Sequence, residues 1–419
     1  MSSSELPAPT VLMARLRRDL EHVAGYGATA SGGVSRTSFS GADRQVRAWL
    51  ADECEQAGLA LRTDGIGNVF MRLEAPGAPA GAPPVWAGSH LDSVPEGGRF
   101  DGALGSLAAL EVLRRLAEEH VPLRRPVEAV VFADEEGNYH HLLGSTAVAR
   151  GFAPNELGEL RGRDGDQLVD ALQAMGWDVG AATRTAVRPG DVHAYVELHI
   201  EQGSVLESAG ARIGVVTAIV GMGGGHLEFR GRQDHAGTTP MPLRRDALRG
   251  AADLLVRLPE VARSVSENAV VTCGILHVEP GGANVVPGLA RLQLDFRDPD
   301  RERILELEEA IVVAARDVAD RHNLKVSYTR ESITDPVPLN PRMQDLVATV
   351  AASQGMQTLR LPSGAGHDAQ NVARLAPTGM IFVPSVEGRS HSPAELSTWE
   401  DIEAGANVLL AMVHALATD

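Results

Sequence analysis

Short apolar segments that alternate with helical patterns constrain the fold of this chain more than any other feature. The segments 84–88, 127–133, 193–200 and 379–383 are apolar enough to be buried strands, and residues 102–120 follow the first of them with a long helical pattern. Strands that are separated by helices pair in parallel, because each helix returns the chain to the same edge of the sheet. We therefore expect an α/β fold with a mostly parallel mixed sheet.

The pattern changes between residues 212 and 328. Two long helical segments, 242–265 and 301–322, lie among alternating strand segments. This order is typical of a ferredoxin-like α+β module. We expect residues 1–211 and 329–419 to form one catalytic domain, into which 212–328 is inserted.

The composition excludes several classes of function. The chain has a formal net charge of −17, which argues against nucleic-acid binding because that needs a basic surface. Lys325 is the only lysine and lies in the strand-like "LKVSY", so neither Schiff-base chemistry nor a Walker loop is supported. No run of about 18 apolar residues is present, so no membrane partner is expected. Cys54 and Cys273 form no CxxC pair, and two cysteines cannot build a disulfide framework. We therefore expect a cytoplasmic location.

Polar residues follow the ends of four predicted strands. These residues are His90, the pair Glu135 and Glu136, His199, and His391 in a later loop. In open α/β sheets, ligands bind at the edge where the parallel strands end. Four segments that lie far apart in the sequence are therefore expected to converge at one site.

The stretch "GSHLDSVPEGGRFDG" supplies three of the candidate metal ligands or their supports. His90 and Asp92 lie two residues apart at a strand end, and Asp101 lies at the start of a helix. Divalent metals accept imidazole and carboxylate together, and Asp92 could orient His90. Taken alone, the stretch fits equally well with a helix cap at Asp101 and an ordinary buried histidine.

The stretch "FADEEGNYHH" places two adjacent glutamates at a strand end. A cation would offset the repulsion between Glu135 and Glu136, so that one could bind metal while the other acts as a general base. A solvated acidic turn is the alternative. Nothing further in the sequence supports the neighbouring His140 and His141 as ligands.

The remaining candidates are ambiguous when each is considered alone. His199 and His391 would ordinarily be structural residues, and only convergence at one sheet edge supports a role for them as ligands. The inserted module contributes His235, Asn284 and Arg297, the last at the end of an alternating strand. An arginine there could hold a carboxylate, whereas a surface ion pair with a neighbouring aspartate is the ordinary expectation.

Seven motifs together resemble one known family. In chain order they are "GSHLDSVPEGGRFDG", "ADEEG", "ELHIEQG", "RQDHAGTTPM", "GGANVVPG", "GAGHDA" and "SHSPAE". They are similar to the dinuclear metallopeptidases that include aminoacylases and glutamate carboxypeptidases. The similarity is greatest to the ureido-hydrolysing branch of N-carbamoyl-L-amino-acid hydrolases, allantoate amidohydrolases and β-ureidopropionases. It extends from about Gly32 to Glu395.

The resemblance implies two divalent ions per subunit, which could be zinc, manganese, cobalt or nickel. His90 and His199 would bind one ion. Glu136 and His391 would bind the other, and Asp101 would bridge the two.

The resemblance also implies the groups that act on the substrate. Glu135 would be the general base, and Asp92 would support His90 as a positioning residue. His235 would stabilise the oxyanion. The expected substrate contacts are Gln202, His235, Asn284, Arg297 and Gly366, with His367 a further candidate for the same pocket.

A homodimer through the inserted domain is a further implication, and so is closure of the two domains over a small ureido-acid substrate. One segment departs from the family pattern. After "DEEG" the family carries an Arg-Phe pair and a longer loop, whereas residues 138–143 read "NYHHLL" here. This departure bears on the substrate preference.

The expected reaction is hydrolysis of the carbamoyl C–N bond of an N-carbamoyl-L-amino acid, which gives the L-amino acid, carbon dioxide and ammonia. Within the same chemistry, allantoate and N-carbamoyl-β-alanine are alternative substrates. A non-catalytic small-molecule binding protein on the same fold is the alternative from another class, but the intact set of candidate metal ligands argues against it.

Overall fold

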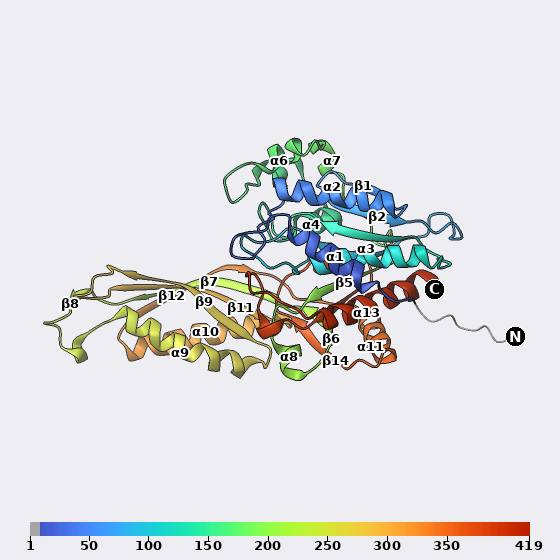
Figure 1. The fold of residues 1–419 in the computed structure, drawn as a ribbon. Helices are drawn as coiled ribbons and strands as arrows, with labels where there is room; N and C mark the ends of the chain where they lie inside the picture. The colour runs from blue at the N-terminus through green and yellow to red at the C-terminus, as the bar shows by residue number, and fades with distance from the viewer. Residues whose placement is uncertain (1–8) are drawn as a thin grey trace. The chain divides into compact units, whose positions relative to one another are not determined.

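A nine-stranded mixed sheet forms the centre of the larger unit in the computed structural model, which describes residues 9–419 (Figure 1). The strand order is β1-β2-β4-β3-β5-β15-β6-β13, and β14 pairs with β6. The strands are β1 (Ala60–Thr63), β2 (Val69–Leu73), β3 (Val85–His90), β4 (Val127–Phe132), β5 (Ala194–Ile200), β6 (Ile213–Ile219), β13 (Val337–Pro338), β14 (Thr358–Ser363) and β15 (Thr378–Val383).

The four central strands of this sheet run in parallel. β4, β3, β5 and β15 pair in parallel, and antiparallel strands flank them on both sides. Every residue of these four strands is buried, as expected for strands covered on both faces. The predicted α/β class with a mixed, centrally parallel sheet is confirmed.

Helices cover the sheet and complete its core. α3 packs against β3, β4 and β5, and α13 packs against β5 and β15. The helices of this unit are α1 (Met13–Ala24), α2 (Gly41–Gln56), α3 (Ala103–Glu118), α4 (Leu143–Arg150), α5 (Pro154–Glu159), α6 (Leu168–Ala174), α7 (Val179–Ala182), α8 (Val205–Ala209), α11 (Pro341–Ser353), α12 (Ala369–Val372), α13 (Trp399–Thr418) and the 3₁₀ turn η2 (Val386–Gly388).

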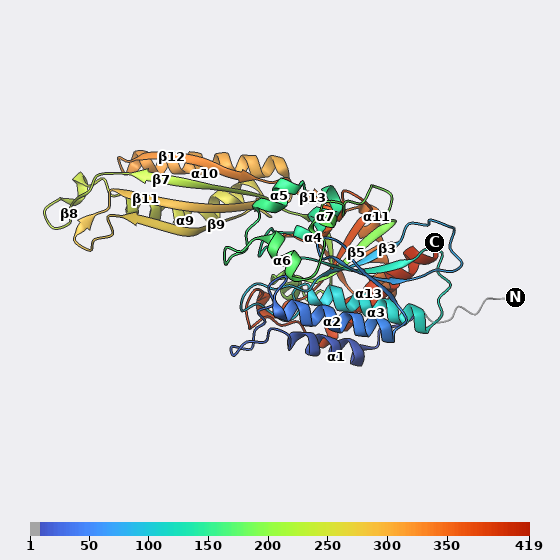
Figure 2. The same cartoon turned by 90° about the horizontal axis from the view of Figure 1, so that it is seen from above.

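A four-stranded antiparallel sheet with two long helices forms the second unit (Figure 2). Its strand order is β12-β7-β11-β9, and α9 and α10 pack against it around a separate apolar core. The chain order β-α-β-β-α-β is that of a ferredoxin-like module. Its elements are β7 (Gly221–Arg230), β8 (Asp234–His235), η1 (Met241–Leu243), α9 (Ala247–Val265), β9 (Val270–Glu279), β10 (Val285–Val286), β11 (Leu289–Asp298), α10 (Arg301–Arg321) and β12 (Lys325–Ile333).

The bounds of the compact units differ from the expected 212–328. The second unit comprises Ala218–Pro338 with Pro362–Ala365, and the first comprises Met1–Thr217, Leu339–Leu361 and Gly366–Asp419. The difference at the start arises because β6 pairs into the large sheet. Within residues 9–419, no helix combines the length and apolar character needed to cross a membrane.

Candidate metal centre

Two groups of possible metal ligands lie where the parallel strands end, and they share one carboxylate. His90, Asp101 and His199 form the first group, and Asp101, Glu136 and His391 form the second. Within each group the ligand atoms lie within 4.8 Å of one another. The structure therefore brings together all five residues that the resemblance implies as ligands, with Asp101 common to both groups.

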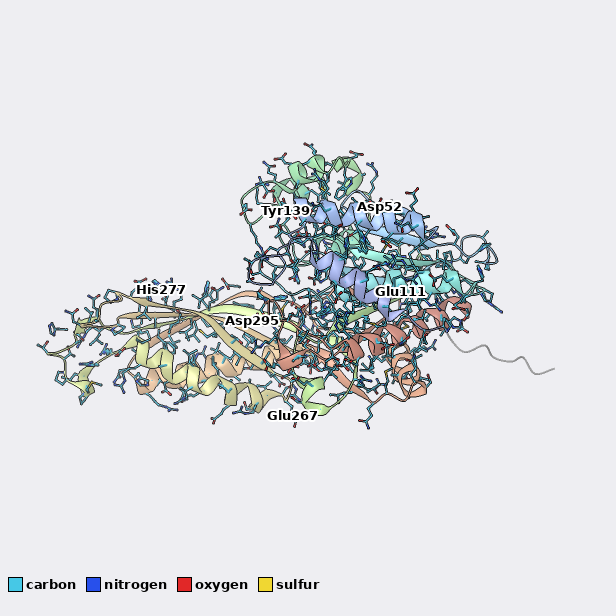
Figure 3. The ribbon with its side chains drawn as sticks, viewed as in Figure 1. Asp52, Glu111, Tyr139, Glu267, His277 and Asp295 are labelled. Carbon is cyan, nitrogen blue, oxygen red and sulfur yellow. The ribbon has the colours of Figure 1, made fainter. Side chains whose placement is uncertain are left out.

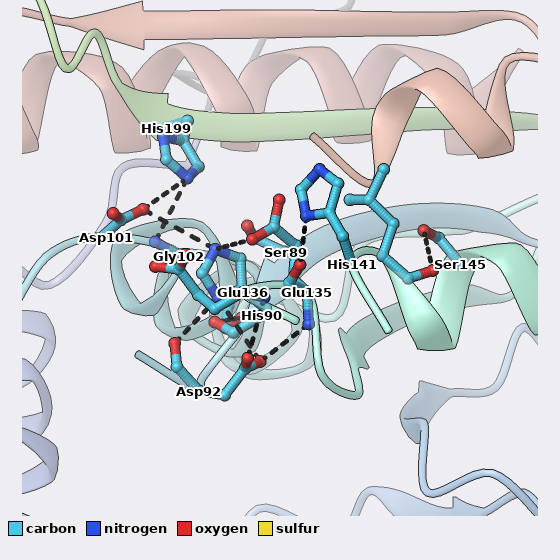
Figure 4. Close-up of polar contacts among 12 residues, drawn as sticks. Ser89, His90, Asp92, Asp101, Gly102, Glu135, Glu136, His141, Ser145 and His199 are labelled. Carbon is cyan, nitrogen blue, oxygen red and sulfur yellow. Dashed lines mark hydrogen bonds and ion pairs between the residues drawn. The ribbon is translucent and has the colours of Figure 1, made fainter. Parts of the chain in front are cut away.

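Asp101 presents one oxygen to each group. Its Oδ1 lies 3.2 Å from His199 Nε2 and 3.8 Å from His90 Nε2 (Figure 4). Its Oδ2 lies 3.2 Å from His391 Nε2, and Glu136 Oε1 is 3.5 Å from the same nitrogen. A carboxylate that faces two ligand sets through different oxygens has the geometry of a bridging ligand.

The two buried imidazoles are held by the backbone in one orientation. His90 Nδ1 lies 3.0 Å from the carbonyl oxygen of Asp92, and His199 Nδ1 lies 2.9 Å from that of Ile200. A carbonyl oxygen only accepts a hydrogen bond, so each Nδ1 carries its proton and each Nε2 presents its lone pair when the ring is neutral. The Nε2 of His199 also accepts a hydrogen bond from the backbone N–H of Gly102 at 3.3 Å. Metal-binding histidines are ordinarily oriented in this way.

Gly102 permits the close approach of the Asp101 loop to His90. Gly102 has φ +62° and precedes α3, and a Cβ at this position would overlap the His90 ring. Glycine meets both requirements, because it adopts positive φ at no steric cost and occupies no side-chain space. The alternative interpretation of Asp101 as a helix cap is wrong, because Gly102 is the N-cap of α3.

Buried carboxylates brace the loops that carry the ligands. Asp92 Oδ1 and Oδ2 accept hydrogen bonds from the backbone N–H groups of Glu135 and Glu136 at 3.2 and 3.0 Å. Glu395 Oε1 accepts from the N–H groups of Phe100 and Asp101 at 2.9 and 3.1 Å. Asp92 thus fixes the glutamate pair, and Glu395 fixes Asp101.

Opposite charges meet at Asp101. Burial would raise the pKa of Asp101, but the His199 and His391 imidazoles outweigh burial and hold the pKa well below its usual range. Burial would lower the pKa of His199, yet Asp101 and Glu197 raise it to about 9. The hydrogen bond to Asp101 raises the pKa of His391 to about 9 as well. The carboxylate therefore attracts positive charge to the positions that a bound cation would occupy.

Nearby positive charge compensates the glutamate pair only in part, since the His391 and His199 imidazoles lower the pKa of Glu136 but do not outweigh burial and Asp101. Burial and the charge of Asp101 raise the pKa of Glu136 to about 8, and burial together with Glu136 raises the pKa of Glu135 well above its usual range. Among the described residues, Glu136 Oε1 is buried without a hydrogen-bond partner. A divalent cation would satisfy this oxygen and offset the repulsion, so the donor set fits the metal that the family implies.

Glu197, His199 and His367 form a third group whose possible ligand atoms lie within 4.8 Å of one another. This group is better explained as structural. Glu197 already accepts hydrogen bonds from Ser89 Oγ at 2.8 Å, Tyr195 Oη at 3.1 Å and the backbone N–H of Ala369 at 3.0 Å. Its oxygens are therefore occupied. The His367 ring lies edge-on to His199, with ring centroids 4.4 Å apart.

Several residues near the centre have left-handed backbone conformations that are uncommon outside glycine. Asp134, Gln202 and His391 have φ values of 56°, 60° and 52°. Such residues cost about 1–3 kcal/mol each and concentrate at functional sites. Gln202 uses its position to donate from Nε2 to Asp101 Oδ2 at 2.9 Å.

Two candidates of the second unit, His235 and Asn284, are exposed and lie in two loops that are hydrogen-bonded to one another. His235 Nδ1 accepts hydrogen bonds from the backbone N–H groups of Gly237 and Thr238 at 3.0 and 3.2 Å. Nδ1 therefore has no proton in this arrangement, and Nε2 is the donor. Asn284 is exposed, and its main-chain carbonyl oxygen accepts from the backbone N–H of Ala236 at 2.9 Å.

Arg297 forms the ion pair that an isolated arginine at a strand end ordinarily forms. Its Nε and Nη2 donate to the two carboxylate oxygens of Asp295 at 2.8 and 3.3 Å, and Nη1 donates to the Gly364 carbonyl at 2.7 Å. Figure 3 labels Asp295 on β11. Two of the five guanidinium N–H donors remain for a ligand.

Sequence reasoning did not identify Glu197 and Glu395 as part of this arrangement. Both lie in motifs that were recognised, "ELHIEQG" and "SHSPAE". Their partners are distant in sequence, since Glu395 binds the backbone of Asp101 across 294 positions. A glutamate in these motifs does not by itself predict which distant groups it will contact. Neither His140 nor His141 belongs to a ligand group among the described residues.

Comparisons with known proteins give the same picture. The sequence model of the family described as Peptidase family M20/M25/M40 matches residues 86–415. An N-carbamoyl-L-amino acid amidohydrolase from Geobacillus stearothermophilus is 41% identical over 405 residues, which cover 96% of this chain and 98% of that protein. An allantoate amidohydrolase from Bacillus subtilis is 33% identical over 400 residues, or 95% of this chain and 96% of that protein.

Solved structures share the fold over the whole chain. The crystal structure of an amidase of the hydantoinase/carbamoylase family from Burkholderia multivorans has a TM-score of 0.91 and 36% sequence identity. The match covers 98% of this chain and 99% of that chain.

Proposed function

The chain belongs to peptidase family M20/M25/M40 and is an amidohydrolase, and from this premise we propose that it cleaves the carbamoyl C–N bond of N-carbamoyl-L-amino acids. The products are the L-amino acid, carbon dioxide and ammonia. The observation that carries the proposal is the pair of ligand groups that share Asp101, together with a buried glutamate, Glu135, that belongs to neither group. The 41% identity to a protein named N-carbamoyl-L-amino acid amidohydrolase supports this choice of substrate.

Enzymes of this family are metal-dependent, and we propose a dinuclear centre of zinc, manganese, cobalt or nickel. His90 and His199 would hold one ion, Glu136 and His391 would hold the other, and Asp101 would be shared between them. The ions supply Lewis-acid activation of water and of the substrate carbonyl when they are bound. The neutral imidazoles and the shared carboxylate are the donors that such ions take.

Glu135 is the general base in this proposal. Its carboxylate lies 3.6 Å from His90 Nε2 and is buried, and the environment raises its pKa. A raised pKa suits a group that takes a proton from water and passes it to the leaving amine. Asp92 supports the geometry by fixing the backbone of Glu135 and Glu136.

His235, Asn284 and Arg297 act on the substrate in this proposal. His235 stabilises the oxyanion, and its Nε2–H tautomer supplies the donor that this role needs. Arg297 binds the α-carboxylate through the N–H donors that its partners leave free, and Asn284 binds it through its side-chain amide. Gln202, Gly366 and His367 are the contacts that we assign to the first unit.

We also propose a homodimer through the inserted unit and a cytoplasmic location. Strand β9 lies at the edge of the antiparallel sheet and exposes Val270, Ile275 and Leu276. An edge strand with exposed apolar side chains is a surface that another chain can cover. Cys54 and Cys273 are unpaired, which fits a reducing compartment.

Ammonia release from a substrate panel tests the proposal. Metal-free protein is reconstituted with each of the four metals and assayed on N-carbamoyl-L-amino acids, N-carbamoyl-β-alanine and allantoate. We expect the highest kcat/KM on an N-carbamoyl-L-amino acid. Allantoate is the second candidate because relatives at 33% identity are named allantoate amidohydrolases. Absence of both stoichiometric metal and turnover would favour a non-catalytic binding protein.

A further inference from the structure

His141 lies beside the proposed general base and is attached to its backbone. The ring Nδ1 is 2.8 Å from the carbonyl oxygen of Glu135 (Figure 4). His141 lies in the loop between the Glu135–Glu136 turn and α4, and it is exposed. It is therefore held at a fixed distance from Glu135 while one part of the ring stays free.

The contact with Glu135 determines which nitrogen can bind a ligand, and how. A carbonyl oxygen only accepts, so Nδ1 of His141 carries the proton. The neutral ring then has a lone pair at Nε2 and accepts a hydrogen bond there. Desolvation by the surrounding protein lowers the pKa of His141, which favours this neutral form.

Gly366 keeps the free nitrogen approachable. A Cβ on Gly366 would lie 2.9 Å from His141 Nε2 and 3.2 Å from Gln370 Oε1. Gly366 does not have a positive φ angle, so the backbone conformation does not require glycine there. What the position requires is the open space, and two hydrogen-bond acceptors face that space.

We propose that His141 is a specificity-determining residue whose Nε2 accepts a hydrogen bond from the terminal amino group of a carbamoyl substrate. This inference rests on the proposed function. The terminal –NH₂ of a carbamoyl group has two N–H donors, which match the two acceptors of His141 and Gln370. An N-formyl or N-acetyl amino acid has the same scissile amide but no donor at that position. The pair of acceptors therefore selects ureido acids over acyl amino acids.

The test compares two substrates that differ only in this group. For one amino acid, kcat/KM is measured on the N-carbamoyl and the N-formyl derivative. The readout is the ratio of kcat/KM on the N-carbamoyl substrate to kcat/KM on the N-formyl substrate. We expect His141→Phe to lower the ratio about tenfold, the ordinary effect of losing one neutral hydrogen bond. His141→Gln, which restores an acceptor, should keep the ratio within about threefold of the wild type.

His140→Phe is the matched control. The His140 ring packs edge-on against Phe152, with centroids 5.3 Å apart, so the same substitution one residue away should leave the ratio unchanged. Metal content and melting temperature are recorded for each variant. If His141→Phe loses its metal, the ratio measured in His141→Gln is the deciding result. A tenfold fall of the ratio in His141→Gln would overturn the role of the acceptor.

The outcomes separate this inference from the proposed function. An active wild type whose ratio is unchanged in His141→Phe overturns the inference alone, and so does an equal loss on both substrates. A wild type that hydrolyses no ureido acid overturns the proposed function as well. A ratio that falls in His141→Phe and holds in His140→Phe supports the inference.

Discussion

The two units hold their candidate functional residues in opposite ways. In the first unit, His90, Asp101 and Glu135 are buried, and their charges compensate or oppose one another within a few ångströms. In the second unit, His235 and Asn284 are exposed, and they form hydrogen bonds with the backbone of the two neighbouring loops that carry them. One set depends on a shared electrostatic environment, whereas the other depends on local hydrogen bonds.

This difference has an energetic consequence. A buried charge is costly unless an opposite charge or a metal compensates it, so a substitution in the first unit should change stability and metal binding as well as catalysis. An exposed side chain has little desolvation to offset. A substitution in the second unit should therefore change turnover alone.

The substitution Glu135→Gln should have the largest effect on rate. It removes the proposed base but keeps the size of the side chain, and we expect kcat to fall about 10²–10⁴-fold. Steady-state ammonia release measures the loss, and metal analysis shows whether the ions remain. A variant with full metal content and nearly normal kcat would show that Glu135 is not the base. It would also mean that the buried charges of the first unit serve metal binding alone.

The substitution His235→Ala should lower kcat about 10²–10³-fold, the usual effect of losing one oxyanion donor. Because the side chain is exposed, the melting temperature and the metal content should match those of the wild type. Kinetics and thermal unfolding are measured on the same preparation. A loss of metal in this variant would contradict the separation of roles between the units.

The substitution Glu395→Gln should give a smaller effect that belongs to the first unit. The carboxylate accepts from the backbone of Phe100 and Asp101, and an amide can keep only part of this bracing. We expect metal affinity to fall about 10–100-fold, as is typical for residues that support a ligand. Competition with a chelator measures the affinity. Glu400→Gln, at an exposed position in the first turn of α13, is the control and should leave it unchanged.

The sequence was sufficient to predict the elements that the strand ends place together. The apolar segments before His90 and Glu135 made buried parallel strands the only consistent interpretation, and the rule for sheet edges then implied convergence. It did not reveal the contacts made by Glu395 or Glu197, because those depend on backbone groups that approach only after folding. Likewise, the apolar segment 212–221 predicted a strand but did not indicate that β6 joins the large sheet.

The pH dependence of the metal's stabilising effect should be the smallest of these effects and should arise in the first unit. Without metal, the folded-state pKa is about 8 for Glu136 and about 9 for His391, above their ordinary values of 4.5 and 6.5. A raised folded-state pKa stabilises the protein fully below the ordinary pKa, and this stabilisation is lost as the pH rises through the folded-state value. The metal-free protein should therefore lose stability between about pH 4.5 and about pH 9, the range set by these values.

A bound divalent ion replaces the protons on these ligands, so its stabilising effect should increase over the same range. The readout is the melting temperature with manganese minus that with chelator, measured at pH 6, 7, 8 and 9, in which titrations elsewhere in the chain cancel. We expect the difference to grow by a few degrees, since 1 kcal/mol shifts the melting temperature of a domain by about 2–4 °C. The same profile in Glu136→Gln should be flatter, because one of the two raised groups is gone. A melting-temperature difference that stays constant or shrinks as the pH rises would mean that metal binding at the buried centre is not linked to proton release. The two units would then differ only in how their residues contribute to catalysis.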